Sequence, residues 1–181
     1  SSGWSVGNFR PTFGSYNVKE AYLETLIPLG LGAEFNGAVR ATDYSTSGYV
    51  TTWKAGLTWQ PIEDIRLRGT RSRDIRAPNL NELFQSGTSR TNTFATNTAV
   101  GQYAGATFRE LTTGNLNLDP EKADTLTLGA VLQPRFLPGF SFSVDWFRTK
   151  VSDAISQFYA DDIAQRCTEG FQSFCAAIVP D

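Results

Sequence analysis

Six stretches of this chain alternate apolar and polar residues with a period of two. In residues 49–60, Tyr49, Trp53 and Leu57 have one parity and Lys54 has the other. Because successive side chains of an extended strand point to opposite faces, each stretch predicts a β-strand with one apolar and one polar face. The six predicted strands are residues 18–27, 31–43, 49–60, 65–75, 121–133 and 140–151.

The connections between these stretches are alternately short and long. The short turns are residues 28–30, 61–64 and 134–139, and the longer loops are residues 43–48, 76–118 and 152–181. Outer-membrane barrels have short periplasmic turns and long extracellular loops, whereas a β-sandwich has no reason to sort its loops by length. We therefore predict an all-β fold, an antiparallel transmembrane β-barrel segment of about six strands. Residues 76–118 have little periodicity and are predicted to be one long loop, and residues 152–181 an extracellular loop.

A soluble β-sandwich module that binds a carbohydrate-type ligand is the alternative fold, because it also consists of alternating strands. A further observation favours the barrel, because a structureless loop as long as residues 76–118 is unusual in a compact soluble domain. Tyr49 and Trp59 lie ten residues apart on one apolar face, which at a strand tilt of about 45° spans about 25 Å and fits two aromatic girdles. Taken alone, this strand favours a sandwich strand with a bulky core face, because soluble β-proteins are commoner.

The two faces of the predicted strands are expected to meet different surroundings. The apolar faces would meet outer-membrane lipid, because a charge at the middle of the bilayer costs about 2–4 kcal/mol. The polar faces would line the lumen of the barrel. Their charged residues are Glu20, Glu24, Glu34, Arg40, Lys54, Arg66, Arg68, Asp74 and Asp145.

The composition argues against several classes of function. The chain has no histidine, which excludes Ser-His and Cys-His nucleophilic sites and imidazole ligation of a metal or haem within it. Adjacent acids such as Asp161 and Asp162 are more often solvated than catalytic, so we expect neither an enzyme nor a cofactor. Lys and Arg are spread along the strands and the net charge is −2, so nucleic-acid binding has no electrostatic support.

Two cysteines, Cys167 and Cys175, lie near the C-terminal end. They are either two buried thiols or a loop disulfide formed in an oxidising compartment. If the barrel prediction is right, the pair lies outside the membrane, and the disulfide is then the expected state.

Ligand contacts, if this chain makes any, are expected from aromatic residues of the loops. Aromatic and amide side chains suit sugars, aromatic siderophores and cobalamin alike, so the sequence does not choose among these ligands. The candidates are Trp4, Phe9, Tyr44, Phe94, Tyr103 and Phe108.

Two segments resemble motifs of the TonB-dependent outer-membrane receptors. The first is residues 72–84, SRDIRAPNLNELF, and the second is residues 114–122, GNLNLDPEK. Leu116 stands where this family usually has proline, and Asp119 where it has lysine. Members of this family that take up haem have a histidine between the two motifs. No histidine lies between them in this chain, which argues against haem as the substrate. The motif residues, which the resemblance treats as mainly structural, are Arg76, Ala77, Pro78, Asn79, Leu80, Glu82, Leu83, Phe84, Asn115, Asn117, Leu118, Pro120 and Glu121.

The resemblance implies a Gram-negative outer-membrane receptor for energy-dependent uptake of a scarce nutrient, such as a siderophore or an oligosaccharide. In this family a barrel of about 22 strands surrounds an N-terminal plug domain, and the TonB energy complex acts through that plug. The chain has no methionine and no plug motif, so we treat it as a fragment of the barrel. It would supply part of the barrel wall and its loops, and it could not transport a substrate alone.

Overall fold

The computed structural model describes residues 11–94, 96 and 98–179, and the chain divides into two compact units. Residues 15–79 and 116–155 form the first, which we call the wall unit. Residues 80–115 and 156–181 form the second, the loop unit, together with the segment before residue 15. No helix among the described residues is long and apolar enough to cross a membrane.

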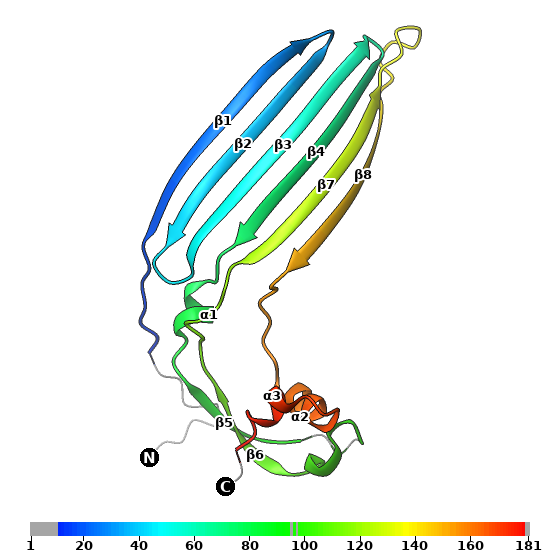
Figure 1. Ribbon diagram of the computed structural model, residues 1–181. Helices are drawn as coiled ribbons and strands as arrows, with labels where there is room; N and C mark the ends of the chain where they lie inside the picture. Colours follow the sequence, from blue (N-terminus) through cyan, green and yellow to red (C-terminus); the bar gives the residue numbers. More distant parts are fainter. Residues whose placement is uncertain (1–10, 95, 97, 180–181) are drawn as a thin grey trace. The chain divides into compact units, whose positions relative to one another are not determined.

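The wall unit is a single six-stranded antiparallel sheet in which each strand is hydrogen-bonded to its neighbour in the order β1-β2-β3-β4-β7-β8 (Figure 1). The chain leaves the sheet after β4 and returns to it at β7. Within the described residues the sheet is open, with β1 and β8 at its edges. The strands are β1 (Val18–Gly30), β2 (Ala33–Tyr44), β3 (Gly48–Ile62), β4 (Ile65–Arg76), β7 (Glu121–Leu132) and β8 (Phe142–Ser152).

The first turn lies slightly later than the sequence analysis placed it. β1 continues through Pro28 to Gly30, and the chain reverses at Leu31 and Gly32. Leu31 has φ 50° and Gly32 has φ 72°, and a two-residue hairpin turn of this kind requires positive φ at both central residues. A proline that we interpreted as the start of the turn therefore belongs to the end of the strand.

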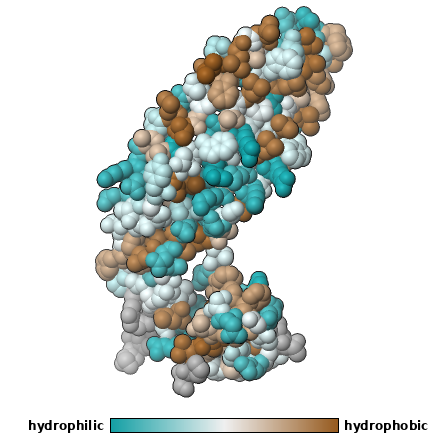
Figure 2. All heavy atoms as spheres, in the orientation of Figure 1, coloured by the Kyte–Doolittle hydropathy of each residue, from teal (hydrophilic) through white to brown (hydrophobic). Residues whose placement is uncertain are grey.

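The strand register brings the apolar parity of all six strands to one face, which we call the outer face. The opposite, inner face carries the polar parity. One outer row crosses the whole sheet, and its members are Ile27, Phe35, Leu57, Gly69, Leu128 and Trp146. The neighbouring inner row contains Glu34, Thr58, Arg68, Gly129 and Asp145. Figure 2 shows apolar residues gathered in the part of the sheet near the short turns.

The apolar band on the outer face runs obliquely across the strands. On β1 it extends from the short turn to Ala21, and the next outward residue is Lys19. On β8 it ends at Trp146, which lies in the same row as Ile27 of β1. Between β8 and β1 the loop-side edge of the band therefore shifts along the strands by six residues, from the row of residue 27 to that of residue 21, which is about 20 Å. The two strands are five strand spacings of about 4.8 Å apart. This corresponds to a strand tilt of about 40°, which is the tilt of transmembrane β-barrels.

The loop unit differs from the single long loop predicted for residues 76–118. That region contains a short helix, an antiparallel β5–β6 hairpin and a 3-10 segment, and the prediction of a structureless loop was wrong. The hairpin strands are rich in threonine and therefore lack the apolar alternation of the wall strands. The elements of the unit are α1 (Leu80–Phe84), β5 (Thr88–Thr93), η1 (Thr98–Tyr103), β6 (Thr107–Thr112), α2 (Ala160–Thr168) and α3 (Gln172–Cys175).

The core of the loop unit comes from segments far apart in the sequence. Phe94, Val100 and Ala164 are buried and form one cluster, against which Tyr103 and Phe108 pack. Ala164 belongs to α2, so this helix covers Phe94, which directly follows β5, and Val100 of η1. The hairpin is therefore stabilised by a helix that begins at residue 160, 48 residues after the hairpin ends at residue 112.

Candidate functional site

An ion pair at the loop end of the wall unit joins the two motif segments. Arg76 is the last residue of β4 and Glu121 is the first residue of β7, and the register places them opposite each other. Arg76 donates from Nε to Glu121 Oε2 at 2.6 Å and from Nη2 to Oε1 at 2.9 Å. The backbone N–H of Ile155 donates to the same Oε1 at 2.6 Å. One carboxylate therefore holds together the ends of β4 and β7 and the segment that follows β8.

This arrangement lowers the pKa of the Glu121 carboxyl. Glu121 lies beyond the apolar band, at the loop end of its strand. The hydrogen bonds from the Arg76 guanidinium, followed by that from the Ile155 N–H, lower its pKa from 4.5 to about 2. Since both groups favour the ionised carboxylate, the pair stabilises the fold above pH 4.5 and loses this contribution as the pH falls through about 2.

A pH series should reveal this dependence. We expect Glu121→Gln to lower the thermal unfolding midpoint of the full-length receptor by a constant amount above pH 4.5, because the carboxylate is ionised there in both states. The difference from the parent protein should shrink as the pH falls through about 2, where Glu121 becomes protonated. Thermal unfolding of both proteins from pH 7 to pH 2 measures it. A difference that does not change with pH would contradict the role of the charge.

The motif segments also meet within the loop unit. The backbone N–H of Asn115 donates to the carbonyl of Glu82 at 2.8 Å, and that of Gly114 donates to the carbonyl of Gln85 at 2.9 Å. A Cβ atom on Gly114 would lie 2.6 Å from the Leu83 carbonyl oxygen, so only glycine permits this close approach. The Leu83 side chain is 2% exposed. These contacts bring residues 82–85 and 114–115 together, so they position the two ends of the segment that the chain inserts between β4 and β7.

Four of the six expected ligand contacts belong to the described residues, Tyr44 in the wall unit and the other three in the loop unit. Trp4 and Phe9 lie outside the described residues. Tyr44 ends β2, where its ring meets that of Tyr16 edge-on with 6.2 Å between the ring centroids.

The other three expected contacts have a packing role that the sequence analysis did not foresee. The rings of Phe94 and Phe108 are stacked with centroids 4.0 Å apart, and Tyr103 lies 5.8 Å from Phe94. Phe94 is 7% exposed, so it presents little surface to a ligand. An isolated aromatic residue in a polar segment looks the same in the sequence whether it is buried in a small core or exposed for ligand binding. The sequence alone therefore could not assign these three residues to a core.

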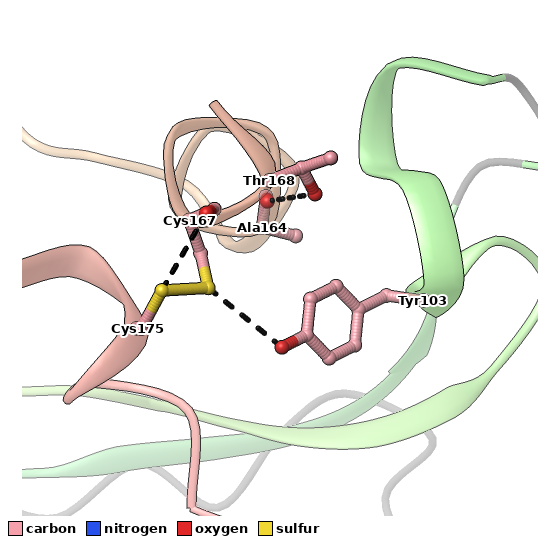
Figure 3. The surroundings of a disulfide bond; sticks show 5 residues. All are labelled: Tyr103, Ala164, Cys167, Thr168 and Cys175. Atoms are coloured by element: carbon pink, nitrogen blue, oxygen red, sulfur yellow. Dashed lines mark hydrogen bonds between the residues drawn. A yellow bond between two sulfur atoms is a disulfide. The ribbon is translucent and has the colours of Figure 1, made fainter. Parts of the chain in front are cut away.

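The two cysteines are joined by a disulfide that ties α2 to α3 (Figure 3). The Tyr103 hydroxyl points at Cys167 Sγ, 3.7 Å away. A disulfide sulfur carries no proton, so the tyrosine is the donor. This contact connects the disulfide to the aromatic core around Phe94. The disulfide and the core therefore belong to one arrangement that holds α2 against the 3-10 segment.

A second ion pair, on the inner face, was not predicted although both of its residues were assigned to the polar face. Arg68 on β4 donates from Nε and Nη2 to the two carboxylate oxygens of Asp145 on β8, the first bond being 2.8 Å long. The strand between them, β7, contributes Gly129 at that row. Because glycine has no side chain there, the pair can close across an intervening strand. Matching residues by register would have revealed it, but a single sequence does not give the register.

A side chain at position 129 should open this pair. A Cβ atom on Gly129 would overlap the Asp145 carboxylate and lie 2.8 Å from Arg68 Nε. We expect Gly129→Ala to lower the free energy of unfolding of the full-length receptor by a small amount, because the pair that it opens is exposed and screened by solvent. Denaturant unfolding measures it, and Gly69→Ala, which meets only a flexible Leu128 methyl at 3.3 Å, is the control. An equal loss from Gly129→Ala in an Arg68→Ala background would contradict this explanation.

The inner face also has two shallow depressions, one of about 430 Å³ over β1 to β3 and one of about 230 Å³ over β1 to β4. Glu24, Ala38 and Lys54 line both, and they lie side by side in the register. The short side chain of Ala38 leaves the space between the two charged residues. Among the described residues, no group of three or more His, Cys, Asp or Glu side chains is placed to hold a metal ion. The described residues thus form a polar sheet face, and the ion pair between Arg76 and Glu121 holds the strands together at the loop end.

Comparison with known proteins agrees with this geometry. Residues 2–176 match the family model described as TonB dependent receptor-like, beta-barrel. The siderophore receptor PirA from Acinetobacter baumannii is similar, with a TM-score of 0.63 at 23% identity over 77% of this chain and 18% of that one. A mutant of the ferric enterobactin receptor PfeA from Pseudomonas aeruginosa gives 0.61 at 19% identity over 75% and 18%. PirA from Pseudomonas aeruginosa gives 0.59 at 20% identity over 75% and 24%. The chain thus spans about a fifth of the length of these structures, and at these identities the likeness concerns the fold.

Proposed function

Because this chain belongs to the TonB-dependent receptor β-barrel family, we propose that it forms part of the wall and extracellular loops of an outer-membrane receptor for energy-dependent nutrient uptake. The observation that carries the proposal is the outer face: an uninterrupted apolar row that crosses all six strands within a band inclined by about 40°. An outer face of this kind has no use in a soluble module, where it would be left in water.

A soluble β-sandwich has no support from the fold. Its core would lie between two facing sheets, whereas the wall unit is one sheet with an apolar and a polar face. The polar inner face, with its mixture of acids and bases around Glu24, Lys54 and Arg68, suits contact with a polar plug domain of the same polypeptide. Transport would then require that plug and the TonB complex that acts on it.

A siderophore is the substrate class we propose for the whole receptor. The structurally similar proteins are described as siderophore and ferric enterobactin receptors, which supports this class over an oligosaccharide. The family is one of transport receptors, so we propose no enzymatic activity. Substrate capture would fall to loops of the complete barrel, of which the loop unit is one.

The test uses the complete gene product. We expect the full-length protein in the outer-membrane fraction, with an electrophoretic mobility that changes on heating, as a barrel that resists detergent until it is boiled would show. A soluble protein without a heat shift would overturn the receptor proposal. Growth of a deletion strain on ferric siderophores under iron limitation, compared with growth on oligosaccharides as the carbon source, then separates the two substrate classes.

A further inference from the structure

Five cations lie close together on the outer face of β4, β7 and β8, where the apolar band ends. We call this group the basic patch, and its members are Arg71, Arg73, Lys122, Arg148 and Lys150. All five have the outward parity, because the register pairs Arg71 with Leu126 and Leu126 with Arg148, and pairs Arg73 with Asp124 and Asp124 with Lys150. Arg71 and Arg148 are the first outward residues after the apolar Gly69 and Trp146.

The acidic residues of this surface neutralise only part of the patch. Arg73 donates to Asp124 at 2.8 Å, and Lys122 lies 3.2 Å from Asp153. The remaining three cations, Arg71, Arg148 and Lys150, are exposed and have no ion-pair partner among the described residues. Five cations and two carboxylates leave a net charge of +3 on a surface of a chain whose total charge is −2.

The position of the patch distinguishes it from ordinary charged strand residues. Arg68 on the inner face has an acid, Asp145, as its neighbour on the same face. The cations of the patch lie on the face that meets lipid, at the edge of the apolar band and toward the long loops. Arg or Lys on a lipid-facing position costs 2–4 kcal/mol at the bilayer centre but only about 0–1 kcal/mol near the interface. At that level the groups within reach are lipid headgroups.

We propose that the basic patch binds the phosphate groups of an anionic glycolipid in the outer leaflet of the membrane around the receptor. The inference rests on the proposed membrane location. Guanidinium and ammonium groups form charge-assisted hydrogen bonds with phosphate oxygens. Arg71 and Arg148 lie on either side of β7, as do Arg73 and Lys150, so each pair is two strand spacings, or about 10 Å, apart. Two rows of such cations can contact more than one phosphate of a single headgroup. The apolar band beside them, which ends at Trp146 and Gly69, contacts the acyl chains of the same lipid.

The test measures binding of diphosphoryl lipid A to the full-length receptor held in phosphatidylcholine nanodiscs. The triple variant Arg71→Gln, Arg148→Gln, Lys150→Gln removes the unpaired cations. Each cation near an anionic lipid surface contributes about fivefold in affinity, so the triple variant should bind about a hundredfold more weakly. The matched control Arg40→Gln, Lys54→Gln, Arg66→Gln makes the same charge change on the inner face and should bind like the parent receptor.

Several outcomes would overturn the proposal. An equal loss of lipid A in both triple variants would mean that only net charge matters. Unchanged binding of dephosphorylated lipid A would exclude the phosphates as the recognised groups. Displacement of lipid A by inorganic phosphate at the same phosphate concentration would make this a phosphate site rather than a lipid site.

A second variant keeps the proposal testable if the triple variant fails to assemble. Asp153→Asn releases Lys122 from its ion pair, and asparagine suits the positive φ of 58° at that position. It should tighten lipid A binding by about fivefold, and unchanged binding would count against the patch. Failure of the receptor proposal itself is seen separately, because the parent protein would then lack the heat shift and the outer-membrane location.

Discussion

Leu57→Arg is expected to prevent assembly of the full-length receptor in the outer membrane, whereas Thr58→Arg should leave assembly unchanged. Leu57 lies in the outer row with Phe35 and Gly69 on the neighbouring strands, so an arginine there would enter the hydrocarbon. Such a charge costs about 2–4 kcal/mol near the bilayer midplane. Thr58 lies on the inner face next to Glu34, where a guanidinium can be hydrated and has a carboxylate beside it.

The amount of heat-modifiable receptor in the outer-membrane fraction measures this difference. The two variants introduce the same side chain at adjacent positions of one strand, so each is the control for the other. A defect only in Thr58→Arg would show that the facing of β3 is the reverse of that assigned. Normal assembly of both variants would show that Leu57 does not face the hydrocarbon, and the assigned facing would then be wrong. A defect in both would indicate that neither position tolerates the added volume, and the pair Leu57→Gln and Thr58→Gln would then separate size from charge.

The facing of the strands could be predicted from the sequence because it depends on parity alone. Leu57, Leu128 and Trp146 have the same parity in their strands as most of their apolar neighbours, and no knowledge of pairing is needed to assign them. The oblique edge of the apolar band and the pair between Arg68 and Asp145 depend on the register. Register is determined by hydrogen bonding between strands and by the turns, and the first turn was already displaced from Pro28 to Leu31.

The loop unit could be predicted much less well, for a different physical reason. Its core combines Phe94 and Val100 with Ala164, and these segments have no shared periodicity that would indicate an association. The resemblance singled out Arg76 and Glu121, yet the ion pair between them joins residues 45 positions apart. Spacing within a motif predicts local structure, whereas contacts of this kind depend on how the chain returns to the sheet.

Phe94→Ala is expected to unfold the loop unit while leaving the barrel wall assembled. The Phe94 ring is stacked on Phe108 and is in contact with Tyr103, and its removal from a buried site costs about 3–5 kcal/mol. The core contains few other buried residues, Val100 and Ala164 among them, so it cannot absorb a loss of this size when whole domains are stable by only about 5–15 kcal/mol.

Limited proteolysis of the full-length receptor in outer-membrane vesicles measures this effect. Cleavage within β5 and β6 should become rapid in Phe94→Ala, while the heat shift that reports the assembled barrel persists. Leu111→Ala is the matched control, because Leu111 lies on β6 and is 66% exposed, so its removal leaves the core intact. Equal resistance of both variants would show that Phe94 does not hold the unit together, and simultaneous loss of the heat shift would show that the two units fold as one. The wall strands are hydrogen-bonded to one another and not to the β5–β6 hairpin, so we expect cleavage of the loop unit without loss of the barrel. The sequence of the loop unit can then vary without preventing assembly of the barrel.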